Sequence, residues 1–308
     1  MQKILILLST YNGEKFLGEQ LGSILIQRGV EPKLLVRDDG SKDGTKSILE
    51  NSQIEHPDFY EEIIYDGNVG STASFSELMR IAYEKYGDKY EYYAFADQDD
   101  YWLQDKLWKA VDKLEVMDNS VPNTYCSDKI IVDSQLKTIA GIRPAKVQIS
   151  KGRALARNIA TGCTMVFNRR ALELFVTRNT EFIKIHDHAI FLICSFMGNV
   201  VYDENAYILY RQHGTNQLGG LDTFKDRATD RLRKKGNLNE HLLERTAKAF
   251  LDAYKDLLSE EDKDLLNTVV LYRTSLSKRL KLLFSKKIAK EQFEDNFFFK
   301  MKVLLGGV

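Results

Sequence analysis

The first two hundred residues alternate between short β-rich runs and segments with helical spacing of apolar residues, and this alternation constrains the fold most. It is typical of a layered α/β sheet. From Phe16 to Leu25 apolar residues repeat at helical spacing, and Gly29 stands where that helix is expected to stop. The predicted strands are ILILLS (4–9), KLLVR (33–37), EIIY (62–65), YYAFA (92–96), IIV (130–132), TMVF (164–167) and VVY (200–202).

Polar clusters follow the first four predicted strands. They read STYNGE, DDGSKDGT, DGNVGS and DQDD. In open parallel sheets, the loops beyond the carboxyl ends of the strands line the ligand crevice. Four such loops in a row therefore predict one binding site at this edge of the sheet.

From about residue 221 the chain changes to long helical patterns rich in Lys, Arg, Glu and Leu. We expect one domain over residues 1–220 and a helical C-terminal region over 221–308. The last helical segment suits a helix lying on an anionic membrane surface, and equally a solvated face of a helix that packs against the domain. Its basic and apolar residues are Lys278, Arg279, Lys281, Lys286, Lys287 and Lys290, interleaved with Leu280, Leu282, Leu283 and Phe284.

Composition excludes several classes of protein. Lys plus Arg number 44 and Asp plus Glu number 44, so no global basic field draws the chain to nucleic acid. The three cysteines, Cys126, Cys163 and Cys194, are far apart among apolar or small residues, which predicts reduced core thiols in a cytosolic protein. The N-terminal apolar run is too short for a signal peptide, and the longest one (189–201) is shorter than the roughly 20 residues that span a bilayer.

The stretch FADQDDYW crowds Asp97, Gln98, Asp99 and Asp100 at the end of a predicted buried strand. Like charges repel, so the cluster predicts a hard divalent cation that is bound by oxygen ligands and shared with substrate phosphates. The alternative is a capped turn, in which Asp99 or Asp100 caps a helix that starts near Leu103.

The loop DDGSKDGT (38–45) places two carboxylates at the end of the second strand. An Asp there can accept a hydrogen bond from the imide N–H that separates uracil and thymine from cytosine and the purines. The neighbouring STYNGE offers a hydroxyl, an aromatic face and an amide, so the two loops predict a pocket for a pyrimidine nucleoside. An ordinary Asp-Gly turn, with Asp43 and Thr45 near a helix start, is the alternative.

Two further motifs carry titratable groups. In HDHAIFLICSF, Asp187 is either the cap of an apolar helix or a general base; a metal-binding HD phosphohydrolase is disfavoured, because those enzymes are all-helical. In YRQHGTNQLGG, His213 is either a third metal ligand or a polar surface residue, and the glycines at 214, 219 and 220 predict a mobile lid.

In this order, with ATGCTMVFN before HDHA, the motifs resemble the family 2 glycosyltransferases of the GT-A fold over residues 2 to about 218. DQDDxW and YRQHGxN resemble the bacterial rhamnosyltransferases that build cell-surface polysaccharides from dTDP-rhamnose. The resemblance implies an α/β fold: a mixed, Rossmann-like nucleotide-diphospho-sugar transferase sheet flanked by helices, with a C-terminal helical appendage. A nucleotidyltransferase would instead show an N-terminal glycine-rich loop with Arg and Lys, which STYNGEKF lacks.

The resemblance also implies roles for particular residues. Asp97 and Asp99 form the DxD motif, with Asp99 the direct ligand of Mg²⁺ or Mn²⁺, Asp97 nearer the ribose and sugar, and His213 a further ligand. Asp187 is the catalytic base. The nucleotide-sugar contacts are Thr10, Tyr11, Asn12, Glu14, Asp39, Asn68, Gly70, Asp97 and Gln98, and the sugar and acceptor region holds Gly162, Cys163, His186 and Arg211.

These roles predict an inverting, metal-dependent glycosyltransferase that moves rhamnose from dTDP-rhamnose onto a hydroxyl of a surface polysaccharide or lipid-linked oligosaccharide. Two alternatives are a transferase of the same fold that uses a UDP-hexose donor and a non-catalytic nucleotide-sugar-binding protein. The expected partners are a dTDP- or UDP-linked donor and a saccharide or lipid-linked acceptor, with no nucleic acid. The expected location is the cytoplasm, with contact to the inner face of the cell membrane through the basic C-terminal helices.

Overall fold

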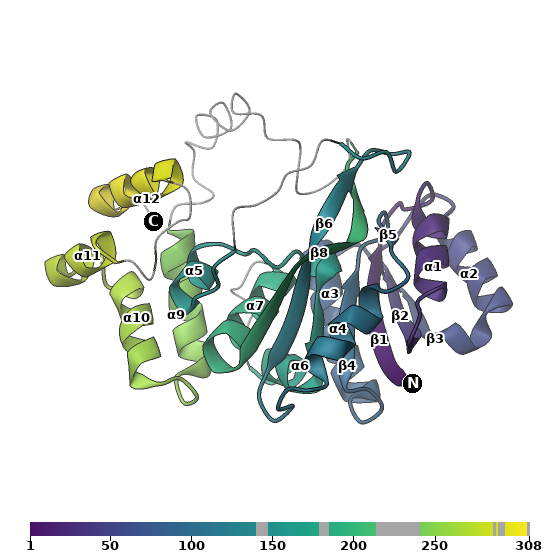
Figure 1. The fold of residues 1–308 in the computed structure, drawn as a ribbon, viewed down its shortest axis with the longest axis horizontal. Coiled ribbons are helices and arrows are strands. Elements are labelled where there is room, and N and C mark those ends of the chain that lie inside the picture. The colour runs from purple at the N-terminus through teal and green to yellow at the C-terminus, as the bar shows by residue number, and fades with distance from the viewer. Residues whose placement is uncertain (140–146, 179–184, 214–240, 286–287, 289–292, 307–308) are drawn as a thin grey trace. The chain divides into compact units, whose positions relative to one another are not determined.

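The computed structural model describes residues 1–139, 147–178, 185–213, 241–285, 288 and 293–306 (Figure 1). They divide into two compact units. Unit 1 holds the described residues of 1–147, 158–179 and 184–211, and unit 2 holds 148–157 with the described residues from 212 onward. The predicted domain boundary between residues 220 and 221 lies outside the described residues, so it stays a prediction.

The described residues of unit 1 include a mixed, eight-stranded sheet of order β3-β2-β1-β4-β7-β6-β8-β5. The first four strands are mutually parallel, β7 is antiparallel to β4 and β6, β8 is parallel to β6, and β5 is antiparallel to β8. The strands are β1 (Gln2–Thr10), β2 (Val30–Asp38), β3 (Tyr60–Tyr65), β4 (Tyr92–Ala96), β5 (Tyr101–Trp102), β6 (Asn123–Val132), β7 (Val166–Asn168) and β8 (Asn199–Arg211).

The strands of the parallel half match the sequence prediction, whereas those of the other half differ from it. β6 and β8 extend well beyond the predicted IIV and VVY, and the short β5 was not predicted. Both long strands carry charged residues, and their register shifts around Asp128, so neither shows clean alternation. The start of the predicted TMVF strand is the 3-10 helix η2 (Gly162–Thr164).

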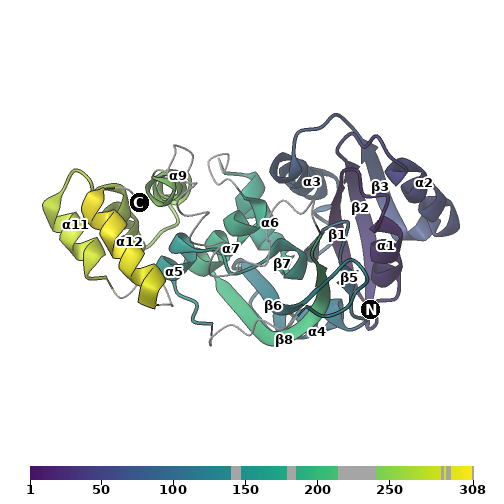
Figure 2. The ribbon, with the colours of Figure 1, turned by 90° about the horizontal axis from the view of Figure 1, so that it is seen from above.

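Helices cover both faces of the sheet (Figure 2). Ile4, Ile6 and Leu8 of β1 join a buried cluster with α1, α2 and α4. On the other face, Phe95 of β4 packs against Phe75 of α3, beside α6 and α7. Burial on both faces explains the nearly continuous apolar runs. These helices are α1 (Leu17–Leu25), α2 (Thr45–Glu55), η1 (Pro57–Phe59), α3 (Ser71–Tyr86), α4 (Lys106–Leu114), α6 (Arg169–Val176) and α7 (His186–Met197).

The first helix ends four residues before the glycine predicted to stop it. α1 ends at Leu25, and Gly29 has a φ of +73° directly before β2. A Cβ at Gly29 would lie 2.7 Å from Cδ1 of Trp108, so this glycine serves the turn into β2 and its contact with α4.

The strand order creates a topological switch point at β1. The chain lays down β2 and β3 on one side of β1 and then returns to place β4 on the other side. In open α/β sheets, ligands bind outside the carboxyl ends of the strands at such a point. The loops after β1 and β4, which carry STYNGE and DQDD, therefore flank the expected binding crevice.

Unit 2 is helical in its described residues. Ser259 is the N-cap of α10: its hydroxyl accepts a hydrogen bond from the N–H of Asp262 and donates to the Asp262 carboxylate. Lys151 of α5 pairs with the same carboxylate at 2.7 Å. A segment from the middle of the chain therefore belongs to the helical unit. Its helices are α5 (Lys151–Ala156), α9 (Leu242–Tyr254), α10 (Glu260–Val270), α11 (Leu276–Leu283) and α12 (Phe293–Leu305).

Two sequence expectations bear on burial and membranes. All three cysteines are buried free thiols, which confirms the prediction of core thiols. Among the helices of the described ranges, none combines the length and the apolar content that crossing a membrane requires.

Candidate active site

The loops that follow β1 and β4 are joined by one glutamine side chain. Oε1 of Gln98 accepts a hydrogen bond from the backbone N–H of Tyr11 at 2.8 Å, and Nε2 of Gln98 donates to the carbonyl of Tyr11 at 3.0 Å. We predicted that Gln98 binds the donor. In the structure, both the oxygen and the nitrogen of its side-chain amide bond to the backbone of Tyr11, so Gln98 joins the loop after β4 to the loop after β1. Tyr11 is 46% exposed, and an exposed tyrosine suits stacking with a base.

The first loop is also tied to the loop after β2. The buried Thr10 hydroxyl donates to Asp38, Oδ1 of Asn12 accepts from the N–H of Lys42, and Oε2 of Glu14 accepts from the N–H of Gly44. Three residues predicted to contact the nucleoside therefore hold the two loops together. They shape the crevice wall through the backbone they fix.

The two carboxylates of the DDGS motif have different partners. Asp38 accepts from Thr10 and from both the N–H and the hydroxyl of Ser41, so it builds the turn. Asp39 accepts from the N–H groups of Val69 and Gly70, each at 2.9 Å. Gly70, predicted as a donor contact, has a φ of +85° and positions Asp39.

Asn68, also predicted as a donor contact, is exposed two residues before Gly70. Its backbone nitrogen lies 3.2 Å from where a Cβ of Gly40 would stand, and Gly40 has a φ of +83°. The loops after β2 and β3 therefore approach each other closely, and glycine permits that approach.

In the acidic cluster after β4, burial and mutual repulsion raise the pKa values of two carboxyl groups. Burial, the Asp99 carboxylate and the Asp187 carboxylate raise the pKa of Asp97 to about 7. Burial, with Asp97 and Asp99, raises the pKa of Asp100 well above its usual range, and Oδ2 of Asp100 has no hydrogen-bond partner in the described chain. A bound cation would remove this repulsion, so the residues present fit a metal site.

Cys163 lies beneath the acidic cluster. Its sulfur and carboxylate oxygens of Asp97 and Asp100 all lie within 4.8 Å of one another. Burial and the Asp100 and Asp97 charges raise the pKa of the Cys163 thiol well above its usual range, so the thiol stays protonated. Mg²⁺ and Mn²⁺ prefer oxygen ligands, so the carboxylates are the better candidates to hold the metal.

The structure excludes the helix-cap alternative for the acidic cluster. The next helix, α4, begins at Lys106 with Asp105 at the N-cap position. Asp100 is fully buried, and its Oδ1 accepts a hydrogen bond from the backbone N–H of Arg211 at 3.1 Å. Neither Asp99 nor Asp100 therefore caps a helix here.

Arg211, predicted to lie in the sugar and acceptor region, is a buried support of the acidic loop. Its Nε donates to the carbonyl of Asp99 at 2.8 Å, and its Nη1 donates to the carbonyl of Ser134 at 2.6 Å. Its Nη2 pairs with Glu19 of α1, and the guanidinium lies 4.3 Å from the ring centre of Phe16. The positive charge near the DxD loop therefore acts mainly on its backbone.

Asp187 lies in the first turn of α7, inside the helix rather than at its N-cap, which is Ile185. Its Oδ1 accepts from Nδ2 of Asn158 and its Oδ2 accepts from the N–H of Gly162, both at 2.9 Å. Burial raises the pKa of Asp187 to about 6. An oriented carboxylate with a raised pKa suits a general base. Asp187 does not occupy the N-cap position that the helix-cap alternative assigned to it.

His186 packs among aromatic side chains of the core. Its ring stacks on Phe75 with centroids 4.0 Å apart and meets Phe95 edge-on. Burial lowers its pKa to about 3, so the imidazole is neutral. A Cβ on Gly162 would lie 3.3 Å from Nε2 of His186, so the glycine permits close packing beside Asp187. His186, predicted near the acceptor, is an aromatic member of the core.

Lys129 is a site residue that the sequence analysis missed. Its ammonium donates to Oγ1 of Thr161 at 2.9 Å and lies 4.0 Å from the ring centre of Tyr210. Its charge acts to lower the pKa of both Asp97 and Asp187, against the raising effect of burial. The available signal was a lysine directly before the apolar IIV run of β6.

Two predicted features of the YRQH motif stay untested. His213 belongs to unit 2, and its role as a metal ligand remains a prediction. The glycines at 214, 219 and 220, predicted to form a lid, lie outside the described residues.

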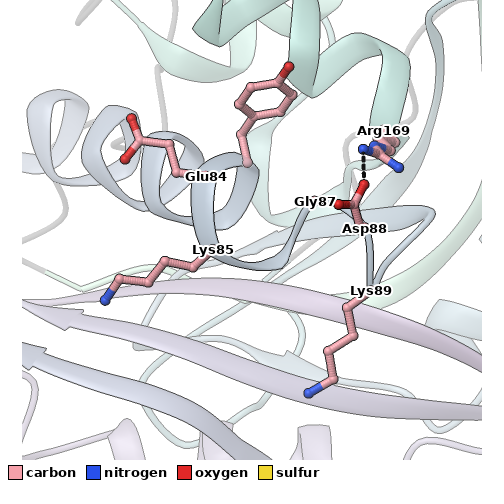
Figure 3. A pocket seen from close by; sticks show the side chains of 7 residues that line it. Glu84, Lys85, Gly87, Asp88, Lys89 and Arg169 are labelled. Carbon is pink, nitrogen blue, oxygen red and sulfur yellow. Dashed lines mark hydrogen bonds and ion pairs between the residues drawn. The ribbon is translucent and has the colours of Figure 1, made fainter.

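A hollow of about 570 Å³ lies between the end of α3 and the start of α6, near the amino end of β4 (Figure 3). Its charges are paired: Arg169 with Asp88, as the dashed line marks, Lys85 with Glu62, and Lys89 with the Glu61 carboxylate. It lies at the opposite end of β4 from the acidic cluster, so it is not part of the candidate site.

Known proteins are similar to this chain in sequence and in fold. A model of glycosyl transferase family 2 matches residues 5–175. The dTDP-rhamnosyl transferase RfbG of Shigella flexneri is 30% identical over 226 residues, which are 71% of this chain and 75% of that protein. The chain belongs to glycosyl transferase family 2. An uncharacterized glycosyltransferase of Nostoc sp. is 26% identical over 224 residues, covering 70% of this chain and 66% of that protein.

Solved structures agree on the fold of this family 2 glycosyltransferase. S. aureus TarS 1–349 in complex with UDP-GlcNAc superposes with a TM-score of 0.58 at 15% identity, covering 98% of this chain and 81% of that chain. A mannosyltransferase from Pyrobaculum calidifontis, in complex with GDP-Man and Mn²⁺, gives 0.51 at 18% identity, covering 98% and 86%. The predicted GT-A fold and enzyme class are confirmed.

The contacts of Arg211 predict how much of its contribution to stability comes from the ion pair with Glu19 and how much from its bonds to backbone carbonyls. Arg211→Met should lower the free energy of unfolding of unit 1 by about 3 kcal/mol, because two half-buried carbonyls lose a charged donor. Glu19→Gln should cost less than about 1 kcal/mol, because the Glu19 side chain is 54% exposed. Urea unfolding followed by tryptophan fluorescence measures this, since Trp102 and Trp108 both lie in unit 1. Equal losses in the two variants would contradict the carbonyl account.

Proposed function

We propose that this family 2 glycosyltransferase transfers a sugar from a nucleoside-diphosphate donor to an acceptor hydroxyl with inversion at the anomeric carbon. The observation that carries the proposal is the pair of carboxylate sites in unit 1. The acidic cluster at Asp97 and Asp99 suits a cation and a diphosphate, and Asp187 is oriented by two donated hydrogen bonds. The charge of Asp187 raises the pKa of Asp97, which supports their working on one substrate.

The proposed reaction is a single displacement. The acceptor oxygen forms a bond to the anomeric carbon as the bond from that carbon to the phosphate oxygen breaks, and the electron pair leaves with the nucleoside diphosphate. Asp187 takes the proton of the attacking hydroxyl. The side chain of Asn158 and the N–H of Gly162 each donate to one Asp187 oxygen, which orients the carboxylate for this transfer.

The carboxylates of Asp97 and Asp99 would hold Mg²⁺ or Mn²⁺, which when bound neutralises charge on the leaving diphosphate. The chain's own contribution is to fix the loop that presents them. Gln98 holds that loop to the loop after β1, and Arg211 donates a hydrogen bond to the Asp99 carbonyl of the same loop. His213 is the proposed further ligand.

The donor we favour is dTDP-rhamnose, and a UDP-hexose is the second candidate. The support is the identity to a protein named dTDP-rhamnosyl transferase, together with the DQDDxW and YRQHGTN motifs. TarS, with UDP-GlcNAc, shows only that a protein of this fold binds a uridine-linked sugar. The proposed acceptor is a hydroxyl of a surface polysaccharide or lipid-linked oligosaccharide.

We also propose that unit 2 contacts an anionic membrane from the inner side. Leu276, Leu280 and Phe284 follow one another at a spacing of four along α11 and just beyond it, and they are 72%, 46% and 74% exposed. Residues 265–290 contain seven Lys or Arg and no Asp or Glu. Apolar side chains framed by basic ones suit a surface of anionic lipids.

Loss of the Asp187 carboxylate should remove catalysis and spare donor binding. Asp187→Asn should lower kcat by roughly 10² to 10⁴, as expected for a lost general base. Asp112→Asn, the same change on the exposed face of α4, should leave kcat unchanged. The raised pKa moves the acid limb of wild type upward, so kcat should fall tenfold per pH unit below about 6. An acid limb near pH 4, or an active Asp187→Asn, would sink the assignment.

Donor and metal can be tested together by calorimetry with dTDP-rhamnose, UDP-glucose and GDP-mannose, each with Mn²⁺ or with a chelator. We expect dTDP-rhamnose to bind most tightly and the chelator to weaken it at least about tenfold, because the diphosphate charge is left unneutralised. Asp99→Asn should remove the effect of Mn²⁺, while Asp105→Asn should keep it. Tightest binding of UDP-glucose supports the UDP-hexose alternative. If none of the donors binds, the proposed function fails.

Membrane contact can be tested by sedimentation with vesicles that contain phosphatidylglycerol. The double change Leu276→Glu and Phe284→Glu should reduce bound protein at least about tenfold, because it removes apolar insertion and adds negative charge. Leu257→Glu is the matched control: this side chain is 42% exposed but lies before the basic run. Equal binding to neutral phosphatidylcholine vesicles, or no loss in the double variant, would contradict the membrane proposal.

A further inference from the structure

A buried arginine stands two residues before Asp39. The side chains of Arg37 and Asp39 are only 2% and 3% exposed, and Nη1 of Arg37 donates to Oδ1 of Asp39. The N–H of Val69 donates to the same oxygen and the N–H of Gly70 donates to Oδ2. The Asp39 carboxylate is therefore held from two sides by the chain itself.

Arg37 in turn is fixed by elements that are distant in the sequence. Its Nη2 donates to the carbonyl of Gly67 at 3.0 Å, and its Nη1 also reaches Oγ of Ser74 at 3.3 Å. The Ser74 hydroxyl is bonded to that of Ser9 on β1 at 2.7 Å. The guanidinium thus links β2, the turn after β3, the start of α3 and, through Ser74, β1. Because so many partners hold the Arg37 guanidinium, it has little freedom to move, and it therefore fixes the position of the Asp39 carboxylate.

The occupied positions on Asp39 leave room for one more donor. An ionised carboxylate has about four lone-pair positions. On Oδ1, Arg37 and Val69 take two, and on Oδ2, Gly70 takes one; no other donor of the described chain reaches the group. One lone pair on Oδ2 remains, and it can only accept. N3 of uracil and thymine carries a hydrogen to donate, whereas N3 of cytosine is itself an acceptor.

We propose that Arg37 is a positioning residue for base recognition: it fixes Asp39 so that its remaining lone pair accepts the imide N–H of uracil or thymine and disfavours cytosine. The inference rests on the proposed function, because it requires a nucleoside at the loops after β1 and β2. The exposed ring of Tyr11, on the loop bonded to the DDGS turn, offers the face on which that base stacks. Arg37 itself touches no substrate.

The test compares UDP, dTDP and CDP as ligands of the full chain in Mn²⁺, by calorimetry. UDP and CDP differ only at N3 and C4 of the base, so their ratio of Kd values reports recognition at this edge of the base. Wild type should favour UDP over CDP by about a hundredfold, because cytosine leaves the buried acceptor unpaired. Arg37→Met should reduce that ratio below about tenfold, mainly by weakening UDP, and Arg37→Lys should restore part of it.

Arg80→Met is the matched control. Arg80 lies on α3 with its side chain 46% exposed and pairs with Glu77 and Glu84, so its loss should leave the ratio at the wild-type value. Asp39→Asn should abolish the preference. Thermal unfolding monitors the fold, and Arg37→Lys decides the matter if Arg37→Met does not fold.

The outcomes separate the inference from the function on which it rests. A UDP-to-CDP ratio unchanged in a folded Arg37 variant, or kept by Asp39→Asn, overturns the inference while the glycosyltransferase proposal stands. A wild type that binds none of the three diphosphates overturns the proposed function, and the positioning role fails with it.

Discussion

Two buried arginines hold the strand ends on which the rest of the site depends. Arg37 donates a hydrogen bond to the Asp39 carboxylate at the end of β2. Arg211 donates to the backbone carbonyls of Asp99, in the acidic loop after β4, and of Ser134. Carboxylates cannot be packed at the edge of a dry sheet without a nearby compensating charge or donor. Each guanidinium supplies several donors in a fixed fork, which lets it fix loop geometry as well as balance charge. Lysine would balance the charge but not the geometry.

The arginines do not fully compensate the charge of the acidic cluster after β4. The remaining repulsion is the reason that this edge of the sheet is a candidate binding site. Arg211 satisfies the backbone of Asp99 and Oδ1 of Asp100 through its own N–H, while the raised pKa of Asp97 shows that repulsion persists there. Folding alone would favour fewer charges at this place. In the proposed function, a bound cation and diphosphate would offset this cost, so the cluster would trade stability for ligand affinity.

The parallel half of the fold was predictable from sequence, because its strands are buried on both faces and the polar clusters mark where they end. The other half was harder. β6 and β8 carry Asp128, Lys129 and Asp203 within their spans, which breaks the periodicity on which strand prediction relies. α5, from the middle of the chain, belongs to the helical unit, and such a connection depends on long-range contacts such as that of Lys151 with Asp262.

The site shows the same division between chemistry that a residue type implies and partners that only the fold supplies. Asp39, Asp97 and Asp187 were named from sequence because the motifs that carry them resemble those of family 2 glycosyltransferases, although a turn or a helix cap was the structural alternative in each case. Their orienting partners lie far away in the chain, as Asn158 does from Asp187, or belong to the backbone, as with Gly70. Several predicted contacts, among them Gln98 and Glu14, turned out to bond the loops to each other. In a crevice built from loops, the polar side chains that shape the walls are of the same types as those that touch the ligand. Composition alone cannot separate the two, and the hydrogen-bond partners that the fold supplies are needed as well: Asp38 is bonded to Thr10 and within its own turn, whereas Asp39 is bonded to Arg37 and to the loop after β3.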